Sequence, residues 1–544
     1  MAQQQPLSEH EKILKQGLDR LEHQIAPLRE RADVRLQRPE LVETQFSAIA
    51  AAGNCFPVSV IEVKGSITLD STALARVTAP YNEQCLGLEH LNSLLAAITN
   101  LYLDAGYVTS RAYITPQDLS DGSVEITVVE GFIEGIHSAD DSLTDTQLAW
   151  AFPVDRGAVL NIRDIEQGVE NLNSVGQNKA TVALNPGQEQ GGTLVMLNNQ
   201  LSRRWRGSVG INNNGVASTG EYQLDSNLVV DNLFGVNDSA FVSVSTNIGS
   251  HELPHAMSRS YALSWSLPTG YWQWSLQNSF YEYEQTVLGD VVNFSMHGSS
   301  FNSSIQLGNT LYRSQTGKLD LAVGFIRKDS KNYIEDVFLE TSSRVLYVWD
   351  LITSYQHFLE QGTISINAHL YKSVPWLDSK RQLVSAEDDF QFTKYQFNIG
   401  YNTYFQIAHQ TVQYAMMADF LYSPKVILAS EALTVGGRYS VRGLSQGGLF
   451  GYKGGYIRND ISIPLQTDWP WPGQVQLFAG IDAGLSNLPE YPQKRSEWVA
   501  GSVLGFKLYD RNFSISFSYA RALRVPDFLQ QKQQEIDFSV RFNF

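Results

Sequence analysis

The chain has 544 residues, enough for several domains, and its formal net charge of −16 argues against nucleic acid as the main ligand. The sequence contains no run of about 18 apolar residues, so it predicts no transmembrane helix. Aromatic residues make up 11% of the chain. That content fits a soluble protein or a transmembrane β-barrel, because barrel strands are apolar only at alternate positions. The first residues, Met1–Gln5, lack the basic and apolar regions of a signal peptide, so an exported form would be a mature chain.

Residues 7–28 have the pattern of an amphipathic helix. Ser8 and Glu11 show the spacing of a capping box, which satisfies free backbone N–H groups at a helix start. Apolar residues recur at intervals of three and four and form one stripe, which comprises Leu14, Leu18, Leu21 and Ile25. The stripe also fits a short coiled-coil or docking helix. Residues 29–53 show no period and mix both charges, which is typical of a flexible linker.

Two consecutive segments then show an α+β pattern. Residues 54–131 begin with a strand pattern at 56–63, continue with helical patterns and end with two strands. Residues 132–204 repeat this order more loosely, with helices near 143–152 and 162–174. Units of about 75 residues suit small α+β domains.

From Trp205 onward the period of the sequence becomes two. Apolar and polar residues alternate in segments such as 222–230 and 241–248, and turn-forming residues separate these segments. At roughly 20 residues per strand and connection, the remaining part of the chain provides about 16 strands. The last segment is apolar at alternate positions, namely Ile536, Phe538, Val540, Phe542 and Phe544. The sequence therefore predicts an antiparallel β-barrel over residues 205–544.

A glycine-rich stretch at residues 433–455 interrupts this alternation. Glycine adopts positive φ values and permits close backbone approach, so many glycines together indicate a long loop with a specific path. We expect such a loop to be held in shape by a contact outside it. Arg442 stands centrally, between Val441 and Gly443, and is the candidate for that contact.

Two short motifs could suggest chemistry. Residues 443–447 fit the G-x-S-x-G pattern of a nucleophile elbow, but that pattern requires a strand-to-helix turn in an α/β sheet. His251 and His255 have a metal-ligand spacing only on a helix, which Pro254 disfavours. We therefore expect no catalytic residue, no metal and no cofactor, and a protein that is not an enzyme.

Several segments resemble the POTRA domains of two-partner secretion transporters. Five ordered matches occur in the first unit: Cys55-Phe56, Cys85-Leu86-Gly87, Gly106-Tyr107-Val108-Thr109-Ser110-Arg111, Gln117-Asp118-Leu119 and Val129-Glu130-Gly131. Residues 161–168 resemble the second POTRA helix of that family. The loop segment Val441-Arg442-Gly443-Leu444 resembles the VRGF/Y signature of the sixth extracellular loop in the BamA/TpsB superfamily of outer-membrane barrels.

The chain thus resembles a TpsB transporter over nearly its whole length. It is similar to filamentous hemagglutinin and hemolysin transporters, and most like the transporters of contact-dependent growth-inhibition toxins. The resemblance implies a mainly β fold with a 16-stranded antiparallel transmembrane β-barrel at residues 205–544. An N-terminal plug helix (1–28), a linker (29–53), POTRA 1 (54–131) and POTRA 2 (132–204) would precede it.

The resemblance also implies roles for particular residues. Asp482 follows Phe478 by four positions, as in the family's F-x-x-x-D strand motif, whose aspartate pairs with the loop arginine. Arg442 is the matching arginine, and the pair would be partly screened in a water-filled lumen. The plug helix and loop 433–455 would occupy that lumen at rest. A strand that ends with Phe542 and Phe544 resembles the recognition signal of outer-membrane barrels.

Cys55 and Cys85 are the two cysteines of the chain. They could be two buried thiols, but in a periplasmic domain a pair more often forms a disulfide. Closing a loop of about 30 residues would stabilise the domain by roughly 3–4 kcal/mol.

The implied function is protein transport across the outer membrane of a Gram-negative bacterium, with the POTRA domains in the periplasm. An unfolded TpsA/CdiA-like exoprotein would dock through its N-terminal TPS domain and pass through the barrel without ATP. Other expected partners are outer-membrane lipid and, during biogenesis, the barrel assembly machinery, and the chain would be a monomer. One rival is a BamA-like assembly factor, which normally carries more POTRA domains and no plug helix. A passive porin or a barrel enzyme needs no POTRA domain.

Overall fold

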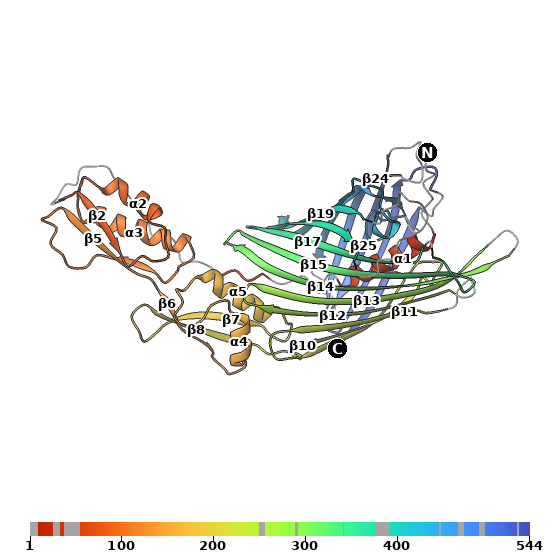
Figure 1. Cartoon of the computed structure of the whole chain (residues 1–544), viewed down its shortest axis with the longest axis horizontal. Coiled ribbons are helices and arrows are strands. Elements are labelled where there is room, and N and C mark those ends of the chain that lie inside the picture. Colours follow the sequence, from red (N-terminus) through yellow and green to blue (C-terminus); the bar gives the residue numbers. More distant parts are fainter. Residues whose placement is uncertain are drawn as a thin grey trace.

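The structure is a computed structural model, which describes residues 9–25, 33–36, 55–249, 256–288, 292–340, 342–376, 391–444, 448–465, 473–488, 496–529 and 533–544. Two small α+β domains stand in a row beside one mouth of a large β-barrel (Figure 1). No helix in the described part of the chain is both long and apolar enough to span a membrane. The candidate metal pair, His251 and His255, and Ser445 of the G-x-S-x-G segment lie outside the described residues.

The first α+β domain packs two α-helices, α2 (Ser71–Thr78) and α3 (Leu88–Asp104), on one sheet, and η2 (Ala79–Tyr81) follows α2. That sheet has the order β2-β5-β4, formed by Val60–Lys64, Ser123–Val129 and Arg111–Tyr113. A separate pair of strands is formed by β1 (Phe56–Val58) and β3 (Gln84–Leu86). The strand expected at 56–63 is therefore divided, because Ser59 turns aside to bond the Gly122 carbonyl and the two halves pair in different sheets.

The second α+β domain follows directly. Its sheet has the order β6-β8-β7, formed by Phe132–Ser138, Gly192–Asn199 and Ala180–Pro186. Helix α4 (Asp145–Ala151) begins with a capping box between Thr144 and Gln147. Helix α5 (Ile162–Asn173) places Ile165 and Leu172 in the domain core, while its other side faces the barrel.

The remaining chain forms a closed antiparallel barrel of 16 strands, which confirms the predicted fold class. The strands are β9 (Trp205–Asn212), β10 (Gln223–Asp231), β11 (Ser239–Asn247), β12 (Met257–Thr269), β13 (Trp272–Val287), β14 (Phe294–Arg313), β15 (Gly317–Ile334), β17 (Arg344–Leu359), β18 (Gly362–Val374), β19 (Thr393–Ile407), β20 (Gln410–Tyr422), β23 (Lys453–Leu465), β24 (Gln474–Asn487), β25 (Ser496–Tyr509), β26 (Phe513–Arg524) and β27 (Gln534–Asn543). A two-residue strand, β16 (Val337–Phe338), extends one edge of β15. The ring closes where β27 pairs with β9.

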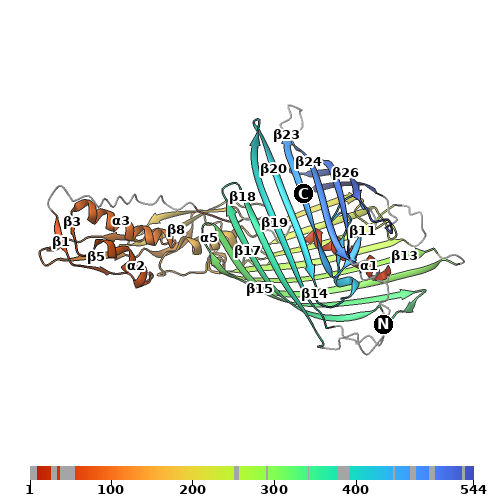
Figure 2. The same ribbon diagram turned by 90° about the horizontal axis from the view of Figure 1, so that it is seen from above.

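The strands have outward-facing and inward-facing side chains at alternate positions, which suits the wall of a barrel. Along β11, Val242 and Val244 point outward, whereas Phe241, Ser243 and Ser245 are buried on the inner side. A closed ring leaves no unpaired edge, and its outer face offers apolar side chains to lipid. Seen from above, the two α+β domains extend in line from the barrel mouth, and the first helix of the chain lies within the ring of strands (Figure 2).

Candidate functional site

The lumen of the barrel contains helix α1 (Glu9–Ile25) (Figure 1). The apolar stripe of this helix contacts the inner wall. Ile13 and Leu14, each 2% exposed, pack against residues of β13 and β14, namely Tyr281, Tyr283 and Met296. Leu18 is partly buried at the same place. Burying a leucine side chain contributes roughly 1.5–3 kcal/mol, so these contacts hold the helix without any covalent link.

The C-terminal part of the apolar stripe contacts another part of the wall. Leu21 packs against Phe241 of β11 and Ala262 of β12. The side chain of Ile25, the last residue of the predicted stripe, lies outside the described part. Gly17 lies so close to the wall that an added Cβ would meet the Tyr281 ring at 2.4 Å. A larger residue at position 17 would therefore push the helix away from β13.

Polar side chains of α1 also contact the barrel wall and the glycine-rich loop. Arg20 is 6% exposed, donates a hydrogen bond to Ser245 and lies 3.6 Å from the carboxylate of Asp225. His23 stacks on Tyr439 with ring centroids 4.3 Å apart. Since Tyr439 belongs to the glycine-rich loop, the helix and the loop contact each other inside the barrel.

The chain between β20 and β23 is the second occupant of the lumen. It contains η3 (Ala429–Glu431) and a small antiparallel pair, β21 (Leu433–Val435) and β22 (Leu449–Gly451). Among its described residues, five apolar side chains are at most 1% exposed, namely Ala429, Val435, Val441, Leu444 and Leu449. Residues 453–455 already belong to the wall strand β23. The valine and leucine side chains of the loop pack together with wall residues such as Leu346, Val348 and Val499, so the wall covers the apolar part of the loop in addition to any contact of Arg442.

Arg442 of this loop reaches Asp482 on the inner side of β24. Its Nε and Nη2 donate to the two carboxylate oxygens of Asp482 at 2.6 and 2.7 Å, and its backbone N–H donates at 3.1 Å. Nη2 also lies 2.7 Å from Asp460 on β23. Gly480 leaves room for the guanidinium, because a Cβ there would lie 2.5 Å from Nη2.

The environment of this pair differs from the expected one. The side chain of Arg442 is 6% exposed and that of Asp482 is 0% exposed, so water does not screen them as it would in an open lumen. Gly443 follows with φ +93°, a conformation that L side chains rarely adopt. The backbone thus turns immediately after the arginine, which aims its side chain at the wall.

A second ionic contact holds the start of the loop, and the sequence did not predict it. Glu431, which is 1% exposed, lies 2.5 Å from Lys328 of β15 and 2.7 Å from Lys394 of β19. Lys394 also lies over the Tyr371 ring. These partners are separated by up to 103 residues in sequence, so no local motif could have identified them.

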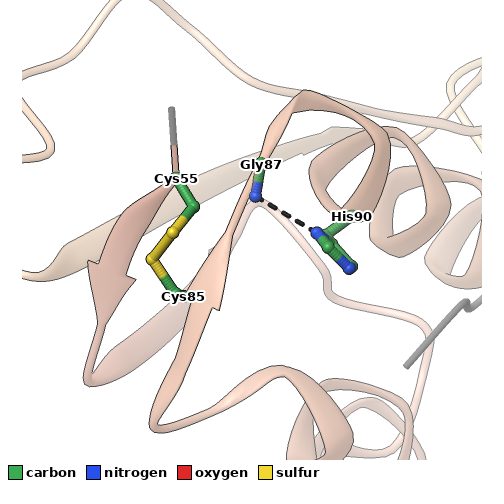
Figure 3. The surroundings of a disulfide bond; sticks show 4 residues. All are labelled: Cys55, Cys85, Gly87 and His90. Carbon is green, nitrogen blue, oxygen red and sulfur yellow. Dashed lines mark hydrogen bonds between the residues drawn. A yellow bond between two sulfur atoms is a disulfide. The ribbon is translucent and has the colours of Figure 1, made fainter. Parts of the chain in front are cut away.

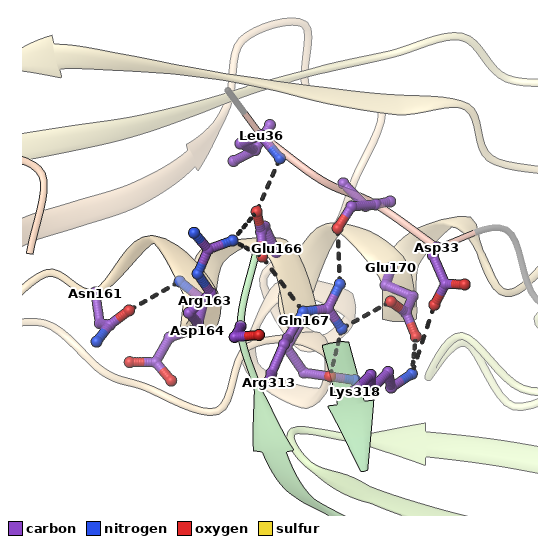
Figure 4. A network of polar contacts seen from close by, with 12 residues as sticks. Asp33, Leu36, Asn161, Arg163, Asp164, Glu166, Gln167, Glu170, Arg313 and Lys318 are labelled. Carbon is purple, nitrogen blue, oxygen red and sulfur yellow. Dashed lines mark hydrogen bonds and ion pairs between the residues drawn. The ribbon is translucent and has the colours of Figure 1, made fainter. Parts of the chain in front are cut away.

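The joint between the second α+β domain and the barrel is a further polar network (Figure 4). Arg313, at the end of β14, donates to Glu170 and Gln167 of α5 at 2.7 and 3.0 Å. Lys318, at the start of β15, donates to Glu170 at 2.6 Å. Asn171 of α5 donates to the Gly270 carbonyl at 2.7 Å. The sequence did not predict these contacts between α5 and the barrel.

A short part of the predicted linker takes part in the same joint (Figure 4). The Val34 carbonyl accepts a bond from Arg313 at 2.7 Å, and the Leu36 N–H donates to Glu166 at 2.8 Å. Arg35 lies over the Phe358 ring at 4.2 Å. Residues 33–36 are therefore bound between domain and barrel, in contrast to the freely flexible linker that mixed charge had suggested.

Cys55 and Cys85 form the predicted disulfide beside the β1–β3 pair, with Cα atoms 5.3 Å apart (Figure 3). Next to it, the Gly87 N–H donates to His90 at 3.2 Å as helix α3 begins. At the other end of the chain, Phe544 exchanges two backbone bonds of 3.0 Å with Gly207 of β9. Phe542 is 62% exposed on the outer face of β27.

The fold and the occupied lumen define a class, that of outer-membrane barrels whose channel is closed from within and whose mouth carries α+β domains. Residues 191–508 match the family described as haemolysin secretion/activation protein ShlB/FhaC/HecB. Residues 56–131 match the ShlB-type POTRA domain, and residues 132–186 match the POTRA domain. The chain belongs to the ShlB/FhaC/HecB family and is a two-partner secretion transporter of the outer membrane, with its POTRA domains on the periplasmic side.

Particular relatives agree with this family. The outer membrane transporter CdiB of Escherichia coli is 31% identical over 88% of this chain and 80% of its own length. The hemolysin transporter protein ShlB of Serratia marcescens is 30% identical over 78% of this chain and 75% of its own length.

Solved structures resemble the chain as well. CdiB from Escherichia coli superposes with a TM-score of 0.88 at 29% identity and covers 99% of this chain and 100% of its own. CdiB from Acinetobacter baumannii, at 21% identity, shares the fold with a TM-score of 0.82 over 98% of both chains.

Proposed function

We propose that this chain secretes an unfolded exoprotein through the lumen that α1 and loop 433–455 occupy at rest. The position of α1 is the observation that supports this most directly. The helix rests on the wall through a few apolar side chains and two polar ones, and none of these contacts belongs to the barrel ladder. It can therefore leave while the barrel stays folded.

The exoprotein first docks on the POTRA domains through its N-terminal TPS domain. Among the described residues, β2 pairs with β5 alone, so the other edge of β2 offers free backbone groups for strand addition. The edge of β6 is partly covered, because Ile133 exchanges backbone bonds with Ala158 and Gly157 at 2.9 and 2.7 Å. These contacts leave the edge of β2 more open than that of β6, and the proposal takes β2 of the first domain as the docking edge.

Transport then proceeds without ATP and without a catalytic residue. The helix and the loop leave the lumen, and the unfolded chain takes their place. Folding of the exoprotein outside the cell prevents its return and supplies the direction of transport.

The cargo belongs to the contact-dependent growth-inhibition toxins, a proposal that rests on the relatives named CdiB. The neighbouring gene provides the check, since it should encode a very large exoprotein with a TPS domain and a C-terminal toxin. During biogenesis the strand with Phe542 and Phe544 is recognised by the barrel assembly machinery, and the finished transporter works as a lipid-embedded monomer.

Binding of the TPS domain tests the docking step. The full chain in nanodiscs and the module of residues 54–204 should both bind the cognate TPS domain at tens of micromolar or better. Val60, which is 57% exposed on β2, offers the sharper test, because Val60→Lys places a charge on the docking edge. Thr181→Lys on β7 is the matched control and should bind normally. Equal binding by both variants would rule out the β2 edge.

A further inference from the structure

The barrel closes through an incomplete ladder. β9 and β27 pair from Ser208–Asn543 to Asn212–Ser539, where β9 ends on the extracellular side. β27 begins five residues before Ser539, at Gln534. Its segment 534–538 is therefore paired with β26 on one side but has no strand of β9 on the other. The extracellular half of this seam must be held in another way.

Asn213 provides the first of the replacing contacts. Its side-chain amide donates to the Ile536 carbonyl at 2.6 Å, and its side-chain oxygen accepts from the Phe538 N–H at 2.9 Å. These two bonds imitate one step of the ladder with a side chain. The backbone N–H of Asn213 also donates to the Phe538 carbonyl at 3.4 Å.

An open pocket of about 680 Å³ lies at this end of the seam. Residues of the β9–β10 connection line one side, and residues at the start of β27 line the other. The lining includes Ala217, Tyr222, Gln533, Glu535 and Ile536, together with Arg438 of the loop. The pocket thus has residues of both edges in its lining, and Arg438 of the loop lies beside them.

Arg438 bonds to both edges at once. On the β9 side, its Nη1 donates to the Asn213 carbonyl at 2.9 Å and to the Asn214 side chain at 2.5 Å. On the β27 side, its Nη2 donates to Asp537 and lies 3.3 Å from Glu535. A planar guanidinium has enough donors for all four groups. One side chain of the lumen loop therefore bridges the first and last strands.

We propose that Arg438 is a positioning residue that locks the extracellular half of the β9–β27 seam, and that withdrawal of the loop from the lumen unlocks it. Arg438 is four residues from Arg442, whose bonds to Asp482 fix the loop on β24. The seam and the loop cannot move independently, because the same short segment is bound to both. The β9–β27 seam is then closed while the loop occupies the lumen and open after the loop has left.

Amide hydrogen exchange on the full chain in nanodiscs tests the lock, and it requires no exoprotein, so its outcome is separate from that of the transport proposal. Arg438→Gln should raise the exchange rate of the Phe538 amide, which is bonded to Asn213 on the β9 side, by about tenfold. The amides of Val540 and Phe542, which face β9 in the paired half of the seam, should stay unchanged. Asp537→Asn keeps the side-chain volume and should give the same local effect. Arg541→Gln, on the fully paired half of β27, is the matched control and should leave the Phe538 amide unchanged.

A further variant tests whether the position of the loop controls the seam. Arg442→Ala keeps Arg438 but frees the loop from β24, so it should also raise exchange at the Phe538 amide. An increase in both Arg438→Gln and Arg442→Ala supports the lock. Unchanged exchange in Arg438→Gln and Asp537→Asn, or an equal increase along the whole of β27, overturns it. A normal seam in Arg442→Ala shows that the loop position does not control the lock.

Discussion

Arg442 and Asp482 form a two-pronged ion pair that is closed off from solvent. Removing one partner of such a pair leaves a buried charge without compensation, which costs roughly 3–5 kcal/mol. The contact to Asp460, whose side chain is 31% exposed, is worth less because solvent screens it. The buried carboxylate of Asp482 therefore contributes more to holding the loop than the partly exposed carboxylate of Asp460.

We expect Arg442→Ala and Asp482→Ala each to leave a folded barrel and to lower secretion sharply. Arg442→Lys should lose part of the activity, because an ammonium cannot bond both carboxylate oxygens in the same way. The measurement is a double-mutant cycle on secretion, in which the double mutant should be no worse than either single mutant. Asp460→Asn serves as the control with a smaller loss. Additive losses would show that the two residues act separately.

Glu431 should anchor the start of the loop as Arg442 anchors its centre. Glu431→Gln leaves Lys394, itself 7% exposed, without its carboxylate, so the loop should loosen and single-channel conductance should rise. Glu431 also contacts Lys328, so the exchange must include all three residues: Glu431→Lys with Lys328→Glu and Lys394→Glu should restore low conductance in planar bilayers. If the triple exchange conducts like Glu431→Gln, these contacts do not hold the loop.

Helix α1 is held at the element scale by packing and by a short tether. Residues 26–32 connect it to the segment 33–36, which is bound at the domain joint. Seven residues span at most about 25 Å when extended. While 33–36 stays bound, the helix can leave the lumen only to a place near the periplasmic mouth.

Deleting residues 1–30 should raise single-channel conductance, because the plug is removed while the joint keeps its segment 33–36. Gly17→Leu should produce a smaller increase, since its side chain collides with the Tyr281 ring. Gln16→Ala, outside the apolar stripe, should conduct like the unchanged chain. Identical conductance after the deletion would mean that α1 does not close the channel.

At the scale of the whole molecule, α5 orients the POTRA domains on the barrel. Burial opposes ionisation of Glu170, but Lys318 and Arg313 outweigh it and hold the pKa of Glu170 below its ordinary value of 4.5. A carboxylate with a lowered pKa stabilises the joint fully above its unfolded value. That contribution is lost as the pH falls through the lower, folded value.

We therefore expect the joint to stay intact from neutral pH to about pH 5 and to loosen below about pH 4. Distances between spin labels on the second POTRA domain and on the barrel would show this as a broadened distribution. Glu170→Gln should broaden the distribution already at neutral pH and remove most of the acid dependence. A distribution that stays narrow in this variant would mean that the joint does not depend on Glu170.

The sequence by itself determined the parts that depend on local pattern. Alternation along the last 340 or so residues predicted the barrel because each strand has one face toward lipid. The stripe of Leu14 and Leu21 predicted an amphipathic helix, and the paired cysteines of a periplasmic domain predicted a disulfide. The ordered POTRA matches identified the family, which the comparisons confirmed.

Only the tertiary structure decided how these parts are joined. Glu431 with Lys328, Arg438 with Asp537, and Arg313 with Glu170 connect residues about 100 or more positions apart. A single charged residue on a loop or at a strand end is not part of a periodic pattern, so the sequence does not show which residue it contacts. The closure of the barrel determines which residues become its neighbours. The buried core of the glycine-rich loop was hidden for the same reason, since the wall that covers its apolar side chains comes from distant strands.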